Sequence, residues 1–185
     1  NRYDSLTSMS DKPGALVISI DFEYAIGYAD EMLSTERQQL VRAEAAISRR
    51  LIELFDRYQV PATWAVVGHL LETDCQVADG RVHADFPPAV YTDDDLDWFA
   101  THPPAGDTTD TLWFDSAGVI KAVKASSTAH ELASHSYAHI IYGAPHIKPE
   151  AIQADLAGIK RIHEEQGLPL TSFIFPRNQE GFHHE

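Results

Sequence analysis

Two histidines four residues apart, His135 and His139, stand in the stretch "ASHSYAH" past the middle of the chain. This spacing places two imidazoles on one face of a helical turn, or lets a tight loop bring them together. Two neutral nitrogen ligands need an oxygen donor to complete a catalytic zinc-type site, which keeps a further position open for water. Because the chain has ten histidines, such a pair also arises by chance. The alternative is one histidine in a core hydrogen bond and the other in solvent.

Two carboxylates, Asp21 and Glu23, end the apolar run "GALVISIDFEYA". On a strand they point to one side while Phe22 packs on the other, so both can approach one cavity. One carboxylate would bind metal and the other would take a proton from the bound water. The alternative is that Asp21 caps a turn and Glu23 is solvated. A carboxylate pair at the end of an apolar strand is costly, however, unless something uses it.

Arg177, in "FIFPRNQ", supplies a cation after another apolar run. Its guanidinium would orient the base carboxylate or face an anionic substrate group, and a surface salt bridge is the alternative. The acidic run 93–97 lacks the glycine and ligand spacing of an EF-hand, which favours a solvated face. Ser136 has no nucleophile-elbow glycines around it. The chain contains neither a phosphate-binding glycine loop nor a dinucleotide fingerprint.

The hydrophobic pattern predicts alternating strands and helices. We expect strands over 14–25, 62–70, 130–136 and 169–176, and helices over 34–58, 114–126 and 148–167. Between them, 73–111 is a Pro- and Asp-rich excursion with little periodicity and one short helix near 93–99. An irregular stretch this long is unusual unless it serves a site.

This order of elements predicts one α/β domain over 1–185 with a parallel sheet, open or barrel-like. Sites in such proteins lie at the carboxyl ends of the strands. The candidate residues fall there: Asp21 and Glu23 end the first run, His135 and His139 follow the third, and Arg177 follows the last.

Composition narrows the class of protein further. The formal net charge of −14, from 14 basic and 28 acidic side chains, argues against nucleic acid as a partner. No apolar run reaches the roughly 18 residues of a membrane span. The single Cys75 excludes an internal disulfide framework and thiolate-rich metal sites. No signal peptide is visible in this fragment, which slightly favours the cytoplasm. The oligomeric state is left open.

Four pieces of the chain, in order, resemble the polysaccharide deacetylase family, the NodB-homology domains of carbohydrate esterase type. "SIDFEYA" stands at that family's aspartate-bearing first motif, and "ATWAVVGHL" resembles its Ala-Thr-Phe-Phe-Val-x-Gly strand. "SHSYAH" matches the histidine motif His-Ser/Thr-x-x-x-His. "FIFPRNQ" stands where the arginine- and proline-containing third motif occurs. The likeness covers 15–179, with the Pro-rich excursion as its least certain part.

The resemblance implies a distorted (β/α) barrel of NodB type, seven-stranded in the full domain and C-terminally incomplete here. It implies a metal-dependent hydrolase that acts on carbon–nitrogen bonds other than peptide bonds, or on acetyl esters. The expected substrate is an acetylated glycan of the cell surface or an exopolysaccharide. One divalent ion is expected, Zn²⁺ with Co²⁺ or Ni²⁺ as alternatives, and His135 and His139 would be ligands.

By position in the motifs, Asp21 would be the general base and Arg177 would steady it. Most family members have two adjacent aspartates, whereas Phe22 follows Asp21 here, so Glu23 would take the carboxylate-ligand role of a variant branch. Pro176 and Asn178 are candidate substrate contacts. The family's later motifs, including its histidine general acid, have no counterpart before the chain ends.

Three tryptophans are candidate sugar platforms, and core packing is the expectation for Trp64, in contrast to Trp98 and Trp113. We select Trp113 as a substrate-binding candidate. Two other functions stay open: a non-sugar amide hydrolase of the same fold, which a closed small pocket would favour, and a catalytically silent domain that binds glycan or a partner protein. The altered aspartate pair is the best support for the silent domain, which would bind no metal.

Overall fold

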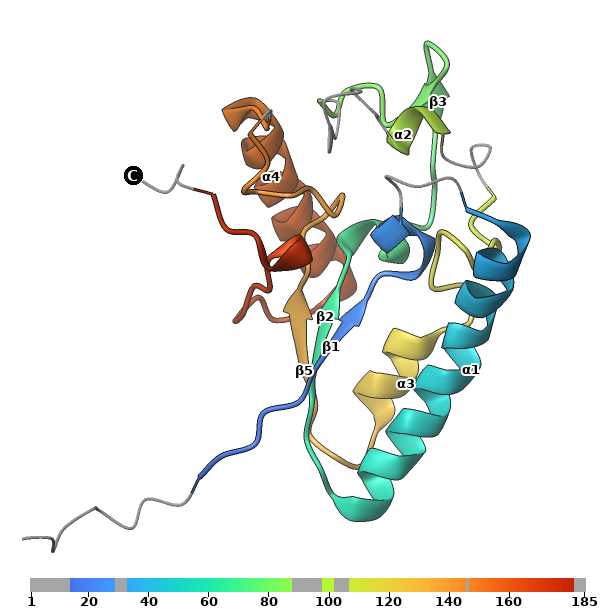
Figure 1. Cartoon of the computed structure of the whole chain (residues 1–185), viewed down its shortest axis with the longest axis vertical. Helices are drawn as coiled ribbons and strands as arrows, with labels where there is room; N and C mark the ends of the chain where they lie inside the picture. Colours follow the sequence, from blue (N-terminus) through green and yellow to red (C-terminus); the bar gives the residue numbers. More distant parts are fainter. Residues whose placement is uncertain (1–13, 29–32, 88–97, 102–106, 146, 182–185) are drawn as a thin grey trace, which may run out of the picture.

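The computed structural model describes residues 14–28, 33–87, 98–101, 107–145 and 147–181 (Figure 1). The acidic run 93–97 and the histidines 183 and 184 lie outside them. The strands are β1 (Ser19–Phe22), β2 (Thr63–Val66), β3 (Val77–Ala78), β4 (Arg81–Val82) and β5 (Glu131–Ser134). The α-helices are α1 (Thr35–Tyr58), α2 (Trp98–Thr101), α3 (Val119–Ala125) and α4 (Pro149–Gln166), and the 3₁₀ turns are η1 (Tyr24–Tyr28), η2 (Gly68–Leu71) and η3 (Pro176–Asn178).

The central sheet is parallel, in the order β1-β2-β5, so its strands follow the order of the chain. Asp21 pairs with Ala65, and Ala65 pairs in turn with Ala133. The strand expected over 169–176 is reduced to a single parallel bridge between Ser134 and Phe173. The parallel sheet that the sequence predicts is therefore present. Its closure into a NodB-type barrel stays a prediction.

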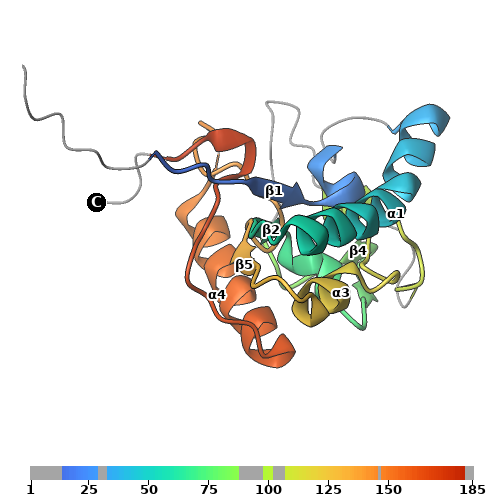
Figure 2. The same ribbon diagram turned by 90° about the horizontal axis from the view of Figure 1, so that it is seen from below.

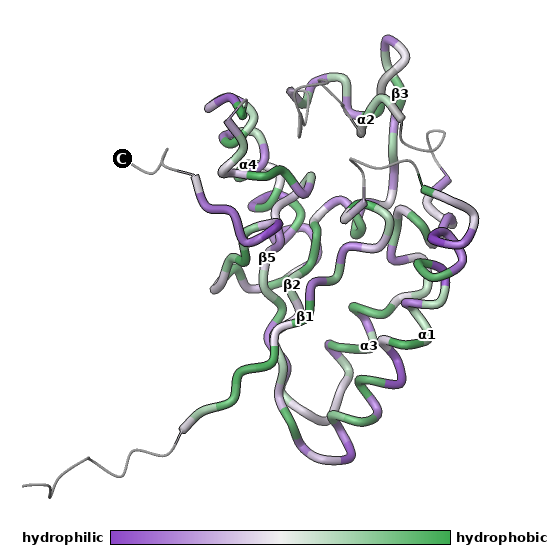
Figure 3. The backbone as a smooth tube through the Cα atoms, viewed as in Figure 1, coloured by the Kyte–Doolittle hydropathy of each residue, from purple (hydrophilic) through white to green (hydrophobic). Residues whose placement is uncertain are grey.

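The first strand is shorter than the sequence predicted. We expected a strand from residue 14, but 14–18 are not part of the sheet, and Leu16 and Val17 are 87% and 77% exposed. Figure 3 shows this hydrophobic segment leading away from the body of the molecule. The physical reason is that β2 begins only at Thr63, whose backbone N–H bonds to the Ile18 carbonyl, so earlier residues have no strand beside them.

The long helices begin and end at the residues that the sequence indicated. The Ser34 hydroxyl caps α1 by accepting a hydrogen bond from the Arg37 N–H at 3.2 Å. Pro149 opens α4, and Gly167 ends it in the left-handed conformation, at φ 59°. Helix α3 (Val119–Ala125) is shorter than the helix expected over 114–126, because it begins only after Asp115. Both carboxylate oxygens of Asp115 accept from the first N–H groups of α3.

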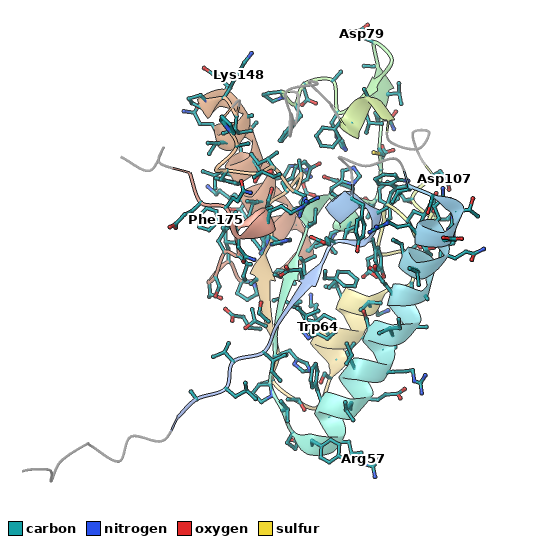
Figure 4. The ribbon with its side chains drawn as sticks, in the orientation of Figure 1. Arg57, Trp64, Asp79, Asp107, Lys148 and Phe175 are labelled. Carbon is teal, nitrogen blue, oxygen red and sulfur yellow. The ribbon has the colours of Figure 1, made fainter. Side chains whose placement is uncertain are left out.

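Helices α1 and α3 pack together at one side of the sheet, while α4 lies at its other side next to β5 (Figure 2). Trp64 on β2 is fully buried, which confirms the expectation that it packs in the core. It meets Phe22 edge-on at 6.3 Å between ring centroids. Figure 4 shows its side chain between the sheet and the α1/α3 pair. This packing fixes the sheet whose carboxyl ends carry the candidate residues.

The described part of the excursion that includes β3, β4 and α2 lies beyond the carboxyl ends of the strands (Figure 1). It contains the antiparallel hairpin β3–β4, with Asp79 at its tip (Figure 4), which the sequence did not predict. The short helix expected near 93–99 is found as α2 at Trp98–Thr101, and 93–97 lie outside the described residues. The excursion is thus placed at the end of the sheet where a site is expected.

Candidate metal centre

Glu23, His135 and His139 converge at the carboxyl ends of the strands. The Glu23 Oε2 lies 2.9 Å from His139 Nε2 and 3.2 Å from His135 Nε2. Both histidines are buried, whereas Glu23 keeps 26% of its side chain exposed. One carboxylate oxygen and two imidazole nitrogens therefore lie within one small volume that opens to solvent on the Glu23 side.

Local backbone geometry produces this convergence. Glu23 follows β1 directly and His135 follows β5 directly, so the two elements deliver them to the same edge of the sheet. Tyr24 takes φ 48° and starts η1, which turns the chain just after Glu23. Gly27 in η1 makes room for the carboxylate, because a Cβ at this position would lie 2.1 Å from Glu23 Oε1. A glycine is thus needed here for close approach.

Asp155 of α4 holds the loop that carries the two histidines. This fully buried carboxylate accepts hydrogen bonds from the Ser136 hydroxyl at 2.8 Å and from the Tyr137 and Ala138 N–H groups at 3.0 and 2.8 Å. The Tyr142 hydroxyl donates to its second oxygen at 2.8 Å. Burial raises the pKa of Asp155, against these hydrogen bonds, which lower it. The loop is thereby tied to α4 at four points.

Tyr137, between the two histidines, anchors the same loop through its side chain. Its ring lies so close to Gly158 of α4 that a Cβ there would come within 2.7 Å of it. Its hydroxyl donates to Glu72 Oε1 at 2.6 Å, and the Arg161 guanidinium also contacts both groups. The loop is therefore fixed from both its backbone and its side chains.

Left-handed backbone conformations gather around the cluster. Within the described residues, Tyr24, Ser136, His139, Arg177 and Asn178 all have positive φ, between 48° and 70°. Such conformations cost on the order of 1–3 kcal/mol each in non-glycine residues and persist where the surroundings impose them. Their position beside the candidate ligands is what a pre-organised site requires.

The charges of the cluster are strongly coupled. Burial alone would raise the pKa of Glu23, but hydrogen bonds from His135 and His139 and their positive charge bring it far below its usual value. Burial lowers the pKa of His135, and the Glu23 hydrogen bond with the Asp21 charge raises it above normal. The ionised Glu23 carboxylate is thus favoured by the two imidazoles that face it.

The donor set fits a divalent cation. Zn²⁺ bonds of roughly 2.0–2.1 Å at a tetrahedral angle separate neighbouring ligand atoms by roughly 3.4 Å. The carboxylate oxygen needs to move only a few tenths of an ångström from its present 2.9 and 3.2 Å contacts. The other nitrogen of His135, Nδ1, lies 2.9 Å from the Ile174 carbonyl, which is the outer hydrogen bond that orients metal-binding imidazoles.

Asp21 lies beside the cluster. Its Oδ2 is 3.9 Å from His135 Nε2, and 51% of its side chain is exposed. Glu23 is therefore the carboxylate in direct contact with both histidines, while Asp21 stands at the solvent-facing side of the group. A further acid near the cluster is Glu44 of α1. Burial and the negative charge of Glu23 raise the pKa of Glu44 to about 7.

The other predicted residues lie at varying positions around this centre. Arg177 is exposed and donates to the Gly27 carbonyl at 3.1 Å, so it braces the turn that follows Glu23. Pro176 is buried, which suits shaping η3 rather than contacting a ligand, whereas Asn178 is exposed. Trp113 is half-buried. Its neighbour Leu112 accepts a hydrogen bond from the Ala25 N–H at 3.0 Å, so this segment lies against η1.

Sequence reasoning missed the residues that support the centre. Asp155 lies in an ordinary helical pattern, and only its burial and four donors reveal its role. It also missed a cluster of His69, Cys75 and His83, whose separation along the excursion hides their contact. A pocket of about 640 Å³ lies elsewhere and is lined by residues such as Asp115 and Lys121. Glu23, His135 and His139 do not border it.

Comparisons with known proteins add no relative. The chain matches no protein-family model, and neither curated proteins nor solved structures give a match. Among the described helices, none is both long and apolar enough to cross a membrane. The function is therefore inferred from the geometry of the centre and from the residues that form it.

Proposed function

We propose that this protein is a metal-dependent hydrolase that removes acetyl groups from a glycan. The single observation that carries the proposal is the contact of one Glu23 oxygen with both His135 and His139 at the carboxyl ends of parallel strands. Two imidazoles and a carboxylate form the three-residue set of a catalytic zinc site that leaves a further position open. The order of sequence motifs around these residues supports the deacetylase reading.

Each residue would have a distinct task. Glu23, His135 and His139 would hold one divalent ion, Zn²⁺ with Co²⁺ or Ni²⁺ as alternatives. Such an ion polarises a carbonyl and makes a water molecule more acidic. Asp21, beside His135 but half exposed, would accept a proton from the attacking water. Arg177 would keep the Glu23 turn in place through Gly27.

Substrate contacts would come from the solvent side of the centre, beside the half-exposed Asp21, and the exposed Asn178 is a further candidate. The half-buried Trp113, on the segment next to η1, offers an apolar face of the kind that sugars stack on. An open, partly exposed centre suits a polymer better than a closed pocket would.

The test is acetate release from N-acetylated and O-acetylated oligosaccharides by the zinc-loaded full chain. The proposal expects release by the parent and none by Asp21→Asn, with the zinc content of the variant unchanged because Glu23 and both histidines remain. Zinc-loaded parent that releases acetate from neither kind of glycan, yet hydrolyses small cyclic amides, would move the function to a non-sugar amide hydrolase. Glycan binding without metal would instead indicate a silent binding domain.

A further inference from the structure

A second cluster of potential metal-binding side chains, separate from Glu23, His135 and His139, lies on η2 and in the excursion that follows it. It consists of His69 on η2, Cys75 in the following segment, and His83 just after β4. The Cys75 Sγ lies 3.6 Å from His69 Nε2 and 3.4 Å from His83 Nε2. The three ligand atoms all lie within 4.8 Å of one another.

These separations are those of a tetrahedral site. Zn–S and Zn–N bonds of roughly 2.3 and 2.05 Å at a tetrahedral angle put sulfur and nitrogen roughly 3.6 Å apart. Both observed sulfur–nitrogen distances lie within about 0.2 Å of that value. The two sulfur–nitrogen contacts are therefore already close to those around a bound ion. We propose that His69, Cys75 and His83 form a second divalent-metal site of zinc type.

The surroundings of the cluster favour a cation. Phe99 lies 5.8 and 5.2 Å from the His69 and His83 rings, and Phe114 lies 5.3 Å from the His69 ring, which makes an apolar wall. Such a wall excludes water and strengthens the attraction between a thiolate and a cation. Glu72 and Asp74 add negative charge close to the sulfur.

A reactive thiol is the competing explanation, and the environment argues against it. Cys75 is fully buried. Burial, followed by the charges of Glu72 and Asp74, raises the pKa of its thiol to about 12 in the absence of metal. Nucleophilic cysteines lie instead in electropositive, partly exposed surroundings that lower this pKa. The burial of Cys75 and the contacts of its sulfur with both imidazoles therefore suit a metal ligand better than a nucleophile.

The role of the second site is structural. His69 is held by its backbone to the histidine loop, because its N–H donates to the Tyr137 carbonyl at 2.9 Å. His83 follows the hairpin β3–β4, and its N–H donates to the Gln76 carbonyl. An ion bound to all three residues would fasten the hairpin to η2 and hence to the loop that carries His135 and His139. The excursion would then be a metal-stapled cover for the end of the sheet.

Cobalt tests this inference independently of the catalytic proposal. Because Cys75 is the only cysteine in the chain, a thiolate-to-cobalt charge-transfer band can come from this cluster alone. We expect metal-free, reduced full chain titrated with Co²⁺ to develop that near-ultraviolet band. Cys75→Ser and His83→Ala should each weaken or abolish it, and each should lower bound cobalt by one equivalent. Glu23→Gln, which leaves the second cluster intact, should retain the band.

A wild-type titration without the charge-transfer band overturns the second site whether or not the variants fold. A band that persists at full strength in His83→Ala overturns the proposed ligand set. If the parent shows the band but binds no further equivalent of cobalt, the Glu23 centre holds no metal. That result contradicts the proposed function and supports the second site. If the second site staples the hairpin, added Zn²⁺ should raise the melting temperature of Glu23→Gln and not that of the Glu23→Gln/Cys75→Ser double variant. Equal shifts in both would contradict this role.

Discussion

Substitution of Gly27 by alanine should empty the Glu23–His135–His139 centre without unfolding the protein. An alanine Cβ at this position would lie 2.1 Å from Glu23 Oε1 and 2.3 Å from Glu23 Cδ. Ordinary contacts need roughly 3.4 Å, so the carboxylate must retreat by more than about 1 Å. Metal sites tolerate displacements of about 0.2 Å. Glu23 would then no longer reach both histidines.

The expected magnitude follows from losing one ligand of three. Disturbing a residue that only supports a ligand costs about 10- to 100-fold in metal affinity, so moving the ligand itself should cost about 100-fold or more. The assay is Zn²⁺ affinity of the chelator-stripped protein by competition with a chromophoric chelator, with the second cluster removed by Cys75→Ser in every sample. The melting temperature should change little, because the displaced group is the end of a flexible side chain.

Gly14→Ala is the matched control, since nothing lies within 4 Å of a Cβ at that position. It makes the same chemical change and should leave zinc affinity as in the parent. Unchanged affinity in Gly27→Ala would refute the reasoning, because it would mean that Glu23 can leave its present place and metal still binds. A large loss of stability in Gly27→Ala would show that the substitution acts through folding and not through the ligand.

Two further predictions concern stability. Asp155→Ala leaves four hydrogen-bond donors of the histidine loop without their acceptor. Each buried donor left unpaired costs about 1–3 kcal/mol, so urea unfolding should show a loss of about 3 kcal/mol or more. A loss below about 1 kcal/mol would contradict its role as the anchor. Glu44→Gln should stabilise the metal-free protein increasingly as the pH rises. In the parent, the pKa of Glu44 is about 7 in the folded state and near 4.5 in the unfolded state. The stability that the neutral Glu44 carboxyl contributes is therefore fully present below pH 4.5 and is lost as the pH rises through 7. Because the carboxyl is partly solvated, the gain at pH 8 should be about 1–2 kcal/mol, and a pH-independent difference between the two proteins would contradict the raised pKa.

The sequence predicted the elements well where local signals were strong. Ser34, Pro149 and Gly167 mark helix ends that the structure reproduces, because caps and the proline and glycine preferences are local. It failed where pairing decides the outcome. Residues 14–18 are apolar enough for a strand but have no neighbouring strand, and 169–176 meet β5 at one bridge only. Strand length in a parallel sheet depends on partners far away in the chain.

The sequence predicted which residues meet at the candidate centre, but it did not predict how their side chains are arranged there. Strand alternation puts Asp21 and Glu23 on one side, so the pattern could not decide which is the ligand. That choice comes from the turn at Tyr24 and the space at Gly27, which bring Glu23 onto the histidines. The sequence did not reveal Asp155 because its partners lie in a separate loop of the chain, and it did not reveal the second cluster because His69, Cys75 and His83 follow no regular spacing. Their roles follow from burial, which only the fold reveals.

The most direct test of the metal centre is the zinc content of the purified full chain by elemental analysis. The two samples are Cys75→Ser and the Cys75→Ser/His139→Ala double variant. The Cys75→Ser substitution disrupts the second cluster, which leaves Glu23, His135 and His139 as the remaining candidate centre among the residues that the structure describes. We expect about one zinc per chain in the Cys75→Ser protein and almost none when His139→Ala is added to it. Equal zinc in both proteins, or none in either after zinc is added, would contradict a metal centre at Glu23, His135 and His139.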